Sequence, residues 1–347
     1  MNSLRPTPKP RQRESTAMNV STDQLAPTLA QRLSMVERML LIRRVEERLG
    51  ADFKAGKLIA GVHLYSGQEA VGVGVCEHLD DNDWIASNHR GHGHFLAKGG
   101  EVRAMMAEIH AKATGVCKGM GGTMHVADLG KGILGANGIV GGGISLICGA
   151  AYSQMLQGQG QVAVAFFGDG ASTQGVMSEA LNLSALWKLP MIFVCENNLF
   201  SEFSRSDTVV AGRIMDRALA YGVPAVQIDG NDIDAVWRAA GQAVRRARTG
   251  EGPSFIEAFT YRMAGHVEAE TGFLQGAQYR SSEEVQAWAA RDPIQRACAR
   301  LLQMPLVSQA QLSEIEARVA AQVEDAVQFA NNSPLPPPEQ ALQFMFA

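Results

Sequence analysis

Two short polar motifs follow apolar runs and carry side chains suited to metal chemistry. A Gly-Asp-Gly motif at 168–170 follows the run 162–167, and an Asn-Asn pair at 197–198 follows the run 191–195. Uninterrupted apolar runs of this length predict strands that are buried on both faces of a sheet. Because parallel strands end at the same edge of a sheet, we expect Asp169 and the asparagines to meet at that edge, where such folds bind ligands.

The oxygen atoms of these side chains favour magnesium held together with a diphosphate. Carboxylate and amide oxygens are the hard ligands that Mg²⁺ prefers, and Mg²⁺ often shares its coordination shell with phosphate oxygens. The glycines on either side of Asp169 let backbone come close to a phosphate. The alternative is a tight turn in which Asp169 caps the following helix. The spacing favours the first interpretation, since GDG and NN separated by residues 171–196 resemble the thiamine diphosphate motif.

Two further segments offer histidines and a cation. The segment SNHRGHGHF, at 87–95, is expected to be a loop in which Arg90 could hold a diphosphate. Its three histidines have no interleaved Cys or carboxylate, so a zinc site is disfavoured, and GHGHFL is not the GxGxxG dinucleotide fingerprint. His266 lies in a polar loop at 262–282 that follows a predicted strand, a position where catalytic groups often lie. The alternative is a solvent-exposed loop histidine.

Hydrophobic periodicity predicts the elements that position these residues. Strands and helices alternate, which indicates an α/β fold with a mostly parallel sheet and helices on both faces. The segment 115–149 is rich in glycine but also holds large apolar side chains, so we expect packed, irregular backbone there. The predicted strands are 84–86, 162–167, 191–195, 225–228 and 254–261; the predicted helices are 24–57 (one or two), 68–79, 143–156, 176–187, 213–221, 233–249 and 308–330.

Composition excludes several classes of protein. The chain has 347 residues, a net charge of -4 and no long basic run, so nothing favours nucleic acid as a partner. No stretch holds 18 uninterrupted apolar residues, so we expect no membrane span. The five cysteines are far apart and form no CxxC pair, which predicts buried thiols in a reducing compartment, with cytoplasmic localisation.

The chain divides into three predicted parts. Residues 1–25 are expected to be a disordered extension; a transit peptide or a true start at Met18 are the alternatives. Residues 26–330 form one predicted domain, since we find no internal repeat and no clear linker. Residues 331–347 are expected to be an extended, proline-rich arm that could grip a partner subunit through an apolar tip made of Leu342, Phe344, Met345 and Phe346.

Taken together, the motifs resemble the alpha subunit of thiamine diphosphate-dependent 2-oxo acid dehydrogenases, the family of pyruvate and acetoin dehydrogenases. The resemblance runs from about residue 36 to about residue 338 and implies the thiamine diphosphate-binding fold. Its motifs are HLYSGQEA (63–70), HRGHG (89–93), KGMGGTMH (118–125), GANGIVGGG (135–143), GDGASTQG (168–175), LWKLPMIFVCENN (186–198) and YRMAGH (261–266).

The resemblance assigns roles to individual residues. It implies that magnesium is bound by the Asp169 and Asn198 side chains and by the backbone carbonyl of Phe200. The implied cofactor-binding residues are His89, Arg90, Gly138, Val140, Gly168, Asp169, Gly170, Ala171, Asn198 and His266. Of these, Arg90 would hold the diphosphate with the backbone at Gly170 and Ala171, and Gly138 and Val140 would meet the aminopyrimidine. The implied catalytic residues, which would face the reacting substrate, are His266 and His63.

The resemblance also implies partners. The carboxylate that activates the aminopyrimidine would come from a beta subunit, in an assembly of two alpha and two beta chains. The substrate would be a small 2-oxo acid or an acyloin, and the two-carbon unit would pass to a lipoyl-bearing acyltransferase. A non-catalytic scaffold chain and an acyloin-forming synthase subunit are the alternatives, and a nicotinamide-dependent reductase is disfavoured because the dinucleotide fingerprint is absent.

Three departures from the family pattern bear on the substrate. His89 stands where the family often has Tyr, and Val267 stands where mitochondrial relatives have a serine that kinases modify. The loop reads AGHVEAE, whereas the pyruvate type often has HGHS and the branched-chain type HHSTSD. The HVE form favours the acetoin-like branch.

Overall fold

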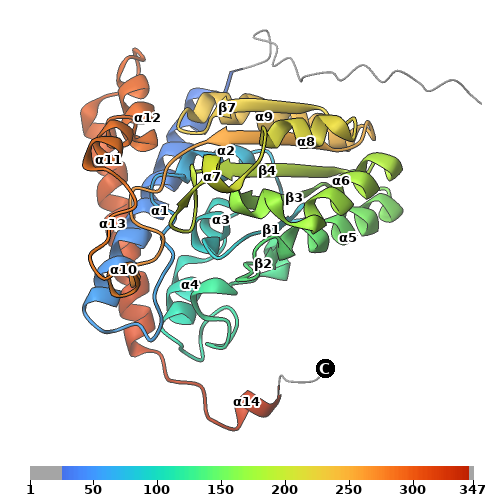
Figure 1. Ribbon diagram of the computed structural model, residues 1–347. Coiled ribbons are helices and arrows are strands. Elements are labelled where there is room, and N and C mark those ends of the chain that lie inside the picture. Colours follow the sequence, from blue (N-terminus) through green and yellow to red (C-terminus); the bar gives the residue numbers. More distant parts are fainter. Residues whose placement is uncertain (1–25, 344–347) are drawn as a thin grey trace, which may run out of the picture.

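The computed structural model describes residues 26–343, and its centre is a six-stranded parallel sheet. The strand order is β2-β1-β3-β4-β8-β7, so crossovers join strands that are not neighbours in the sequence (Figure 1). The strands are β1 (Trp84–Ala86), β2 (Ile133–Gly135), β3 (Ala163–Gly168), β4 (Met191–Asn197), β7 (Ala225–Asp229) and β8 (Ser254–Phe259). The predicted α/β fold with a parallel sheet is therefore confirmed.

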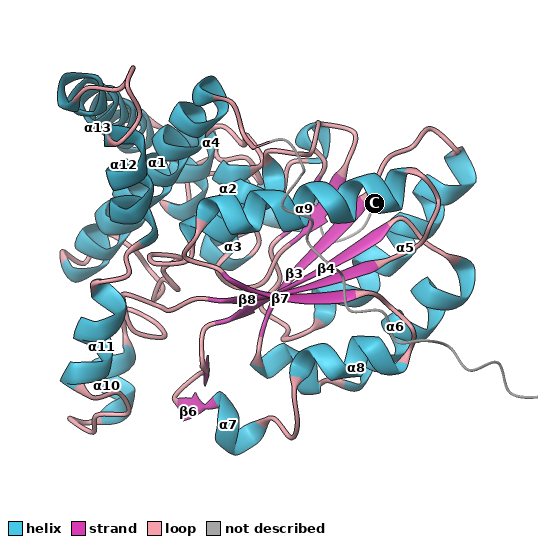
Figure 2. Cartoon of the chain, turned by 90° about the horizontal axis from the view of Figure 1, so that it is seen from above, coloured by secondary structure: helices cyan, strands magenta, loops and turns pink. Residues whose placement is uncertain are grey.

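Side chains alternate along the strands and build two separate cores. Along β3, Val164 and Phe166 face one core, whereas Ala165 and Phe167 face the other, because successive residues of a strand point to opposite faces. Helices cover both faces, and Figure 2 shows α9 and α8 on opposite sides of the strands. The first core packs against α1 (Leu29–Lys54), α2 (Glu69–Cys76), α3 (Gly91–Ala97), α4 (Val102–Ile109), α9 (Ile233–Arg248), α12 (Pro293–Leu302) and α13 (Gln309–Asn332). The second core packs against α5 (Gly142–Gln157), α6 (Gly175–Trp187) and α8 (Ile214–Ala220).

Several predicted elements are confirmed with small shifts in their ends. The strand 84–86 is found as predicted, and the helix expected at 143–156 is α5. The strand expected to end at 195 continues to Asn197, because β8 pairs with it along that length. The helix before Pro190 already ends at Trp187, where Lys188 takes a left-handed conformation with φ 51°.

Two predicted loops and one further polar segment contain regular structure. The segment 87–95 was expected to be a loop, but it becomes helical at Gly91, and every residue of α3 is buried. The polar segment after residue 198 forms the hairpin β5 (Phe200–Ser201) and β6 (Ser204–Arg205), followed by α7 (Ser206–Val209). The predicted loop 262–282 holds α10 (Glu270–Leu274) and leads into α11 (Ser282–Ala289). These elements are short or rich in glycine and polar residues, so hydrophobic periodicity did not reveal them.

The predicted extension at 1–25 lies outside the described residues, as do Phe344, Met345 and Phe346 of the predicted apolar tip. Residues 334–337 form neither helix nor strand and lead to α14 (Gln340–Gln343), which lies away from the sheet (Figure 1). All five cysteines are free thiols. Within 26–343, no helix is both long and apolar enough to cross a membrane.

Candidate cofactor-binding site

A cavity of about 290 Å³ opens at the carboxyl ends of the parallel strands. β3 and β4 pair with Gly168 opposite Glu196, so Asp169 and the asparagine pair leave the sheet side by side. All the site residues expected from the sequence line this one cavity: His63, His89, Arg90, Gly138, Val140, Gly168, Asp169, Gly170, Ala171, Asn198, Phe200 and His266. The structure thus brings together residues from six of the seven motifs, together with Phe200.

The Asp169 carboxylate is buried, with 1% of its surface exposed. Its Oδ2 accepts a hydrogen bond from Ser206, whereas its Oδ1 has no hydrogen-bond partner. Burial raises the pKa of Asp169 to about 6, and nearby backbone N–H groups and Arg262 oppose this shift in part. A buried carboxylate oxygen without a partner is costly, and a bound cation would remove that cost. Asp169 therefore fits a metal ligand.

The Asn198 side chain is positioned by neighbours on both of its atoms. Its Nδ2 donates to Oε1 of Gln68 at 3.2 Å, and its Oδ1 accepts from the backbone N–H of Phe200 at 3.3 Å. An amide oxygen has two lone pairs, so Oδ1 keeps one for a metal. This hydrogen bond uses the backbone N–H of Phe200. Its backbone carbonyl, which the resemblance implies as a magnesium ligand, is not involved. The donor set is all oxygen, which suits Mg²⁺.

Backbone comes close to the cavity at two glycines. A Cβ added to Gly170 would lie 2.3 Å from Oγ of Ser201, so no larger residue fits there without movement. Gly141 has φ +82° and directly precedes α5, whose first residues line the cavity. The amino terminus of a helix of this length favours an anion. The chain therefore offers oxygen ligands for a cation beside backbone N–H groups for phosphate, and both fit a magnesium-bound diphosphate.

Arg90 is the cation predicted for the diphosphate, and it is buried beside the cavity. Its Nη1 donates to the backbone carbonyl of Leu64 at 2.8 Å, and its Nη2 lies 3.1 Å from Nδ1 of His266. It forms no ion pair with a carboxylate in residues 26–343. Burial, together with the charge of Arg262, lowers the pKa of Arg90 to about 9. An anionic ligand would therefore stabilise the charged form of this buried guanidinium.

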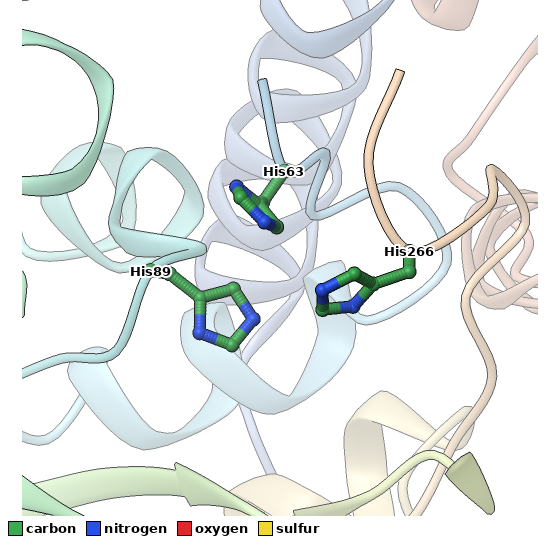
Figure 3. A group of neighbouring side chains, drawn as sticks. All are labelled: His63, His89 and His266. Carbon is green, nitrogen blue, oxygen red and sulfur yellow. The ribbon is translucent and has the colours of Figure 1, made fainter. Parts of the chain in front are cut away.

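Three histidines form one wall of the cavity (Figure 3). The ring of His63 lies 4.7 Å from that of His89 and 4.9 Å from that of His266. Burial and then the charge of Arg90 lower the pKa of His63 to about 3 and that of His266 to about 2, and the same causes lower the pKa of His89 well below its usual value. All three imidazoles are therefore neutral near pH 7.

The spacing of the three histidines would suit a metal ion, because one nitrogen of each lies within 4.8 Å of the others. Two arginines argue against that interpretation. Arg90 and Arg262 both lie close to Nδ1 of His266, at 3.1 and 3.0 Å, and since arginine only donates, this nitrogen accepts from both. The adjacent positive charges repel a dication, so the group is better suited to facing an anion or a polar substrate.

The other two histidines of the predicted loop 87–95 do not line the cavity. His92 bonds to Oγ1 of Thr123 at 2.7 Å, and His94 lies between Ser87 and Glu196 at 2.7 and 3.1 Å. Both are buried in the turns of α3 that the sequence did not predict. They support neighbouring elements and do not contact the space where a ligand would lie.

Among the residues at or beside the cavity that sequence reasoning did not single out, four polar ones take part in its hydrogen bonds: Gln68, Glu196, Ser206 and Arg262. Glu196 accepts hydrogen bonds from Tyr65 and His94, and it was hidden at the end of a predicted apolar strand. Arg262 stands in the motif YRMAGH, directly after the predicted strand 254–261, so its charge at a strand end was a usable signal. Gln68 stands in the motif HLYSGQEA, so its place in that motif was a usable signal, whereas no motif includes Ser206.

Comparison with known proteins adds the family. The profile of the dehydrogenase E1 component family matches residues 37–339. The chain is 48% identical over 320 residues to the alpha subunit of the acetoin:2,6-dichlorophenolindophenol oxidoreductase of Bacillus subtilis, covering 92% of this chain and 94% of that protein. For the subunit of the same name from Cupriavidus necator, the identity is 46% over 312 residues, which cover 89% of this chain and 92% of that protein. For the chloroplastic pyruvate dehydrogenase E1 component subunit alpha-3 of Oryza sativa, the identity is 38% over 368 residues, which cover 99% of this chain and 85% of that protein.

Proposed function

The chain belongs to the dehydrogenase E1 component family, and from this premise we propose that it is the alpha subunit of a thiamine diphosphate-dependent enzyme that cleaves acetoin or decarboxylates a related 2-oxo acid. The observation that carries the proposal is the cavity at the strand ends. It combines Asp169, which has an unpartnered buried oxygen, with Asn198 and a buried Arg90.

The residues of this chain would bind and orient the cofactor. Asp169, Asn198 and the carbonyl of Phe200 would hold Mg²⁺, while Arg90 and the backbone at Gly170 would hold the diphosphate. When bound, thiamine diphosphate supplies a nucleophilic carbon that attacks a carbonyl and takes up the negative charge left by carbon–carbon cleavage. The neutral imidazoles of His63 and His266 would face the reacting carbonyl and donate or accept a proton at a ring nitrogen.

A beta chain would complete the site. Of the carboxylates that line the cavity within 26–343, Asp169 is assigned to the metal, Glu196 accepts hydrogen bonds from Tyr65 and His94, and the Glu202 side chain is largely exposed. This supports a separate chain as the source of the carboxylate that activates the aminopyrimidine. The relatives bear the name alpha subunit, which supports the same conclusion.

An exposed apolar face supports that assembly. Leu146 and Leu156 on α5 and Leu186 and Trp187 on α6 are exposed, and these two helices lie side by side (Figure 1). The face continues to the cavity through Ile139 and Val140, the exposed apolar residues that precede α5 and line the cavity rim. Exposed apolar side chains gathered in this way are typical of protein interfaces. A beta chain seated here would cover the mouth of the cofactor site.

The acetoin branch is the better supported substrate class. Identity to the two acetoin oxidoreductase subunits is 48% and 46%, against 38% for the rice pyruvate dehydrogenase subunit. The acyl unit would then pass to a lipoyl-bearing acyltransferase.

The proposal is tested with the chain co-expressed with its beta subunit and purified as a complex. We expect Mg²⁺-dependent binding of thiamine diphosphate by calorimetry, and reduction of dichlorophenolindophenol that depends on acetoin more than on pyruvate. Reduction with pyruvate alone would move the chain to the pyruvate branch. Absence of any thiamine diphosphate binding by the intact complex would refute the proposal.

A further inference from the structure

We propose that Arg262 is a second anion-binding residue of this site and that, together with Arg90, it holds the terminal phosphate of the bound cofactor. This inference rests on the proposed function and deepens it. The residue follows β8 and lines the cavity, with 1% of its surface exposed. Its Nη2 donates to the backbone carbonyl of Glu202 at 2.8 Å, and its Nη1 lies 3.0 Å from Nδ1 of His266.

The guanidinium of Arg262 is not satisfied by the chain alone. Its Nε is buried and has no hydrogen-bond partner, and it forms no ion pair with any carboxylate of residues 26–343. Burial lowers the pKa of Arg262, and the acidic groups of Tyr279, Asp169 and Glu270 offset this lowering only in part. A buried cation without a paired anion is unfavourable, so the fold retains a group that an anionic ligand would stabilise.

The position of Arg262 indicates which anion it would bind. Arg90 and Arg262 converge on the same atom, Nδ1 of His266, so the two guanidiniums meet at one point of the cavity wall. The charge of Arg262 also acts on Asp169, the carboxylate of the metal corner. The end of the diphosphate would be the group held between the metal ligands and both guanidiniums, since Mg²⁺ prefers phosphate oxygens. A planar guanidinium with parallel N–H groups matches a phosphate in shape and charge.

The test measures binding to the intact complex. Magnesium pyrophosphate and magnesium thiamine diphosphate are titrated separately into wild-type and R262M complexes by calorimetry. We expect both probes to bind roughly 10- to 100-fold more weakly to R262M, because a charge-assisted hydrogen-bonding group is lost. We also expect the melting temperature of the ligand-free R262M complex to equal or exceed that of the wild type, because a buried unpaired charge is removed.

Arg205→Met is the matched control. Arg205 also lies over the ring of Phe200, but it is partly exposed, pairs with Glu284 and is outside the cavity lining, so this variant should bind both probes normally. If R262M unfolds, R262K replaces it, since lysine keeps the charge but loses the guanidinium fork, and its affinity should fall roughly tenfold.

The outcomes separate the two proposals. Wild-type complex that binds neither probe contradicts the proposed function itself. Wild-type complex that binds both, with R262M or R262K binding equally well, overturns the role of Arg262 alone. A variant that retains pyrophosphate affinity and loses only apparent affinity for pyruvate would also overturn it, because Arg262 would then bind a substrate carboxylate.

Discussion

We expect Asp169 to contribute more to ligand binding than to the stability of the ligand-free fold. Its carboxylate is buried, and only one of its two oxygens accepts a hydrogen bond. We predict that Asp169→Asn weakens magnesium-dependent binding of thiamine diphosphate by at least roughly 100-fold, because the charged metal ligand is lost. The melting temperature of the ligand-free complex should stay constant or rise, because a buried charge is removed. Calorimetry and thermal melting measure the two effects.

Asp207→Asn is the control, since Asp207 lies on the same short helix as Ser206 and its side chain is largely exposed. This variant should change neither quantity. Unchanged cofactor affinity in Asp169→Asn would exclude the proposed metal site. A large loss of stability without ligand would instead identify Asp169 as a structural turn residue.

The histidine wall predicts a specific pH dependence. In the folded chain the pKa of His63 is lowered to about 3, whereas an unfolded histidine titrates near 6.5. Below about pH 6.5 the unfolded chain therefore binds more protons than the folded chain at this residue, so stability falls as the pH drops towards 3. We predict that His63→Asn reduces the stability lost between pH 7.5 and pH 5 by about 1 kcal/mol, measured by urea unfolding.

His125→Asn, which replaces an exposed histidine outside the cavity lining, should leave the same pH dependence unchanged. His266→Asn should act like His63→Asn, since the pKa of His266 is lowered to about 2 by the same causes. A wild-type slope preserved in both cavity variants would mean that these imidazoles are charged or exposed in solution.

At the scale of elements, one buried carboxylate organises the glycine-rich segment that leads to the cavity. Glu108 on α4 is fully buried and accepts hydrogen bonds from the backbone N–H groups of Cys117, Gly119, Gly121 and Gly122, at 2.7 to 3.0 Å. The same segment continues to Met124, which lines the cavity. Four orphan backbone donors are thus satisfied by one side chain, which explains why so many glycines form ordered structure there.

We predict that Glu108→Gln destabilises the chain by about 2 to 4 kcal/mol, because an amide offers one acceptor oxygen and turns an NH₂ group towards backbone donors. Cofactor affinity should fall as well, since the segment before Met124 loses its anchor. Urea unfolding and calorimetry report the two effects. Glu314→Gln, at an exposed position of α13, should alter neither. A change of less than about 0.5 kcal/mol in Glu108→Gln would show that the segment is held by other contacts.

The elements differ in how far the sequence could predict them. The apolar runs became β3 and β4 because strands buried on both faces need no polar positions, and their ends placed Asp169 and Asn198 together. The helix α3 was missed because its glycines and histidines suggest a loop, and its stability comes from burial. The anchor at Glu108 and the unpaired state of Arg262 were also hidden, since both depend on which distant backbone or charge lies nearby. A local sequence pattern does not show which distant residues will become neighbours in the fold.

The two sides of the molecule differ in their outer surfaces. Helices cover both sides of the sheet, but α5 and α6 carry a group of exposed apolar side chains. On the side of the first core, α9 contacts β4, β7 and β8, while the long helices α1 and α13 pack against other helices and add to the same core. On the other side, α5 and α6 contribute buried residues to the second core and also carry large apolar residues that are exposed. The cavity mouth shares this side through Ile139 and Val140. A partner that buries the face would therefore stabilise the assembly and close the cofactor site at once.

This arrangement predicts that a charge on the apolar face separates the subunits without unfolding the alpha chain. Leu186 is 69% exposed, so Leu186→Lys should leave the melting temperature of the isolated chain unchanged while weakening binding of the beta chain by at least roughly tenfold, measured by analytical ultracentrifugation. Leu306→Lys is the control, because Leu306 is 76% exposed but lies between α12 and α13, away from the face. If both variants assemble like the wild type, the beta chain docks elsewhere. If the Leu186→Lys variant assembles normally but no longer binds thiamine diphosphate, the apolar face maintains the shape of the cavity and is not the surface that binds the beta chain.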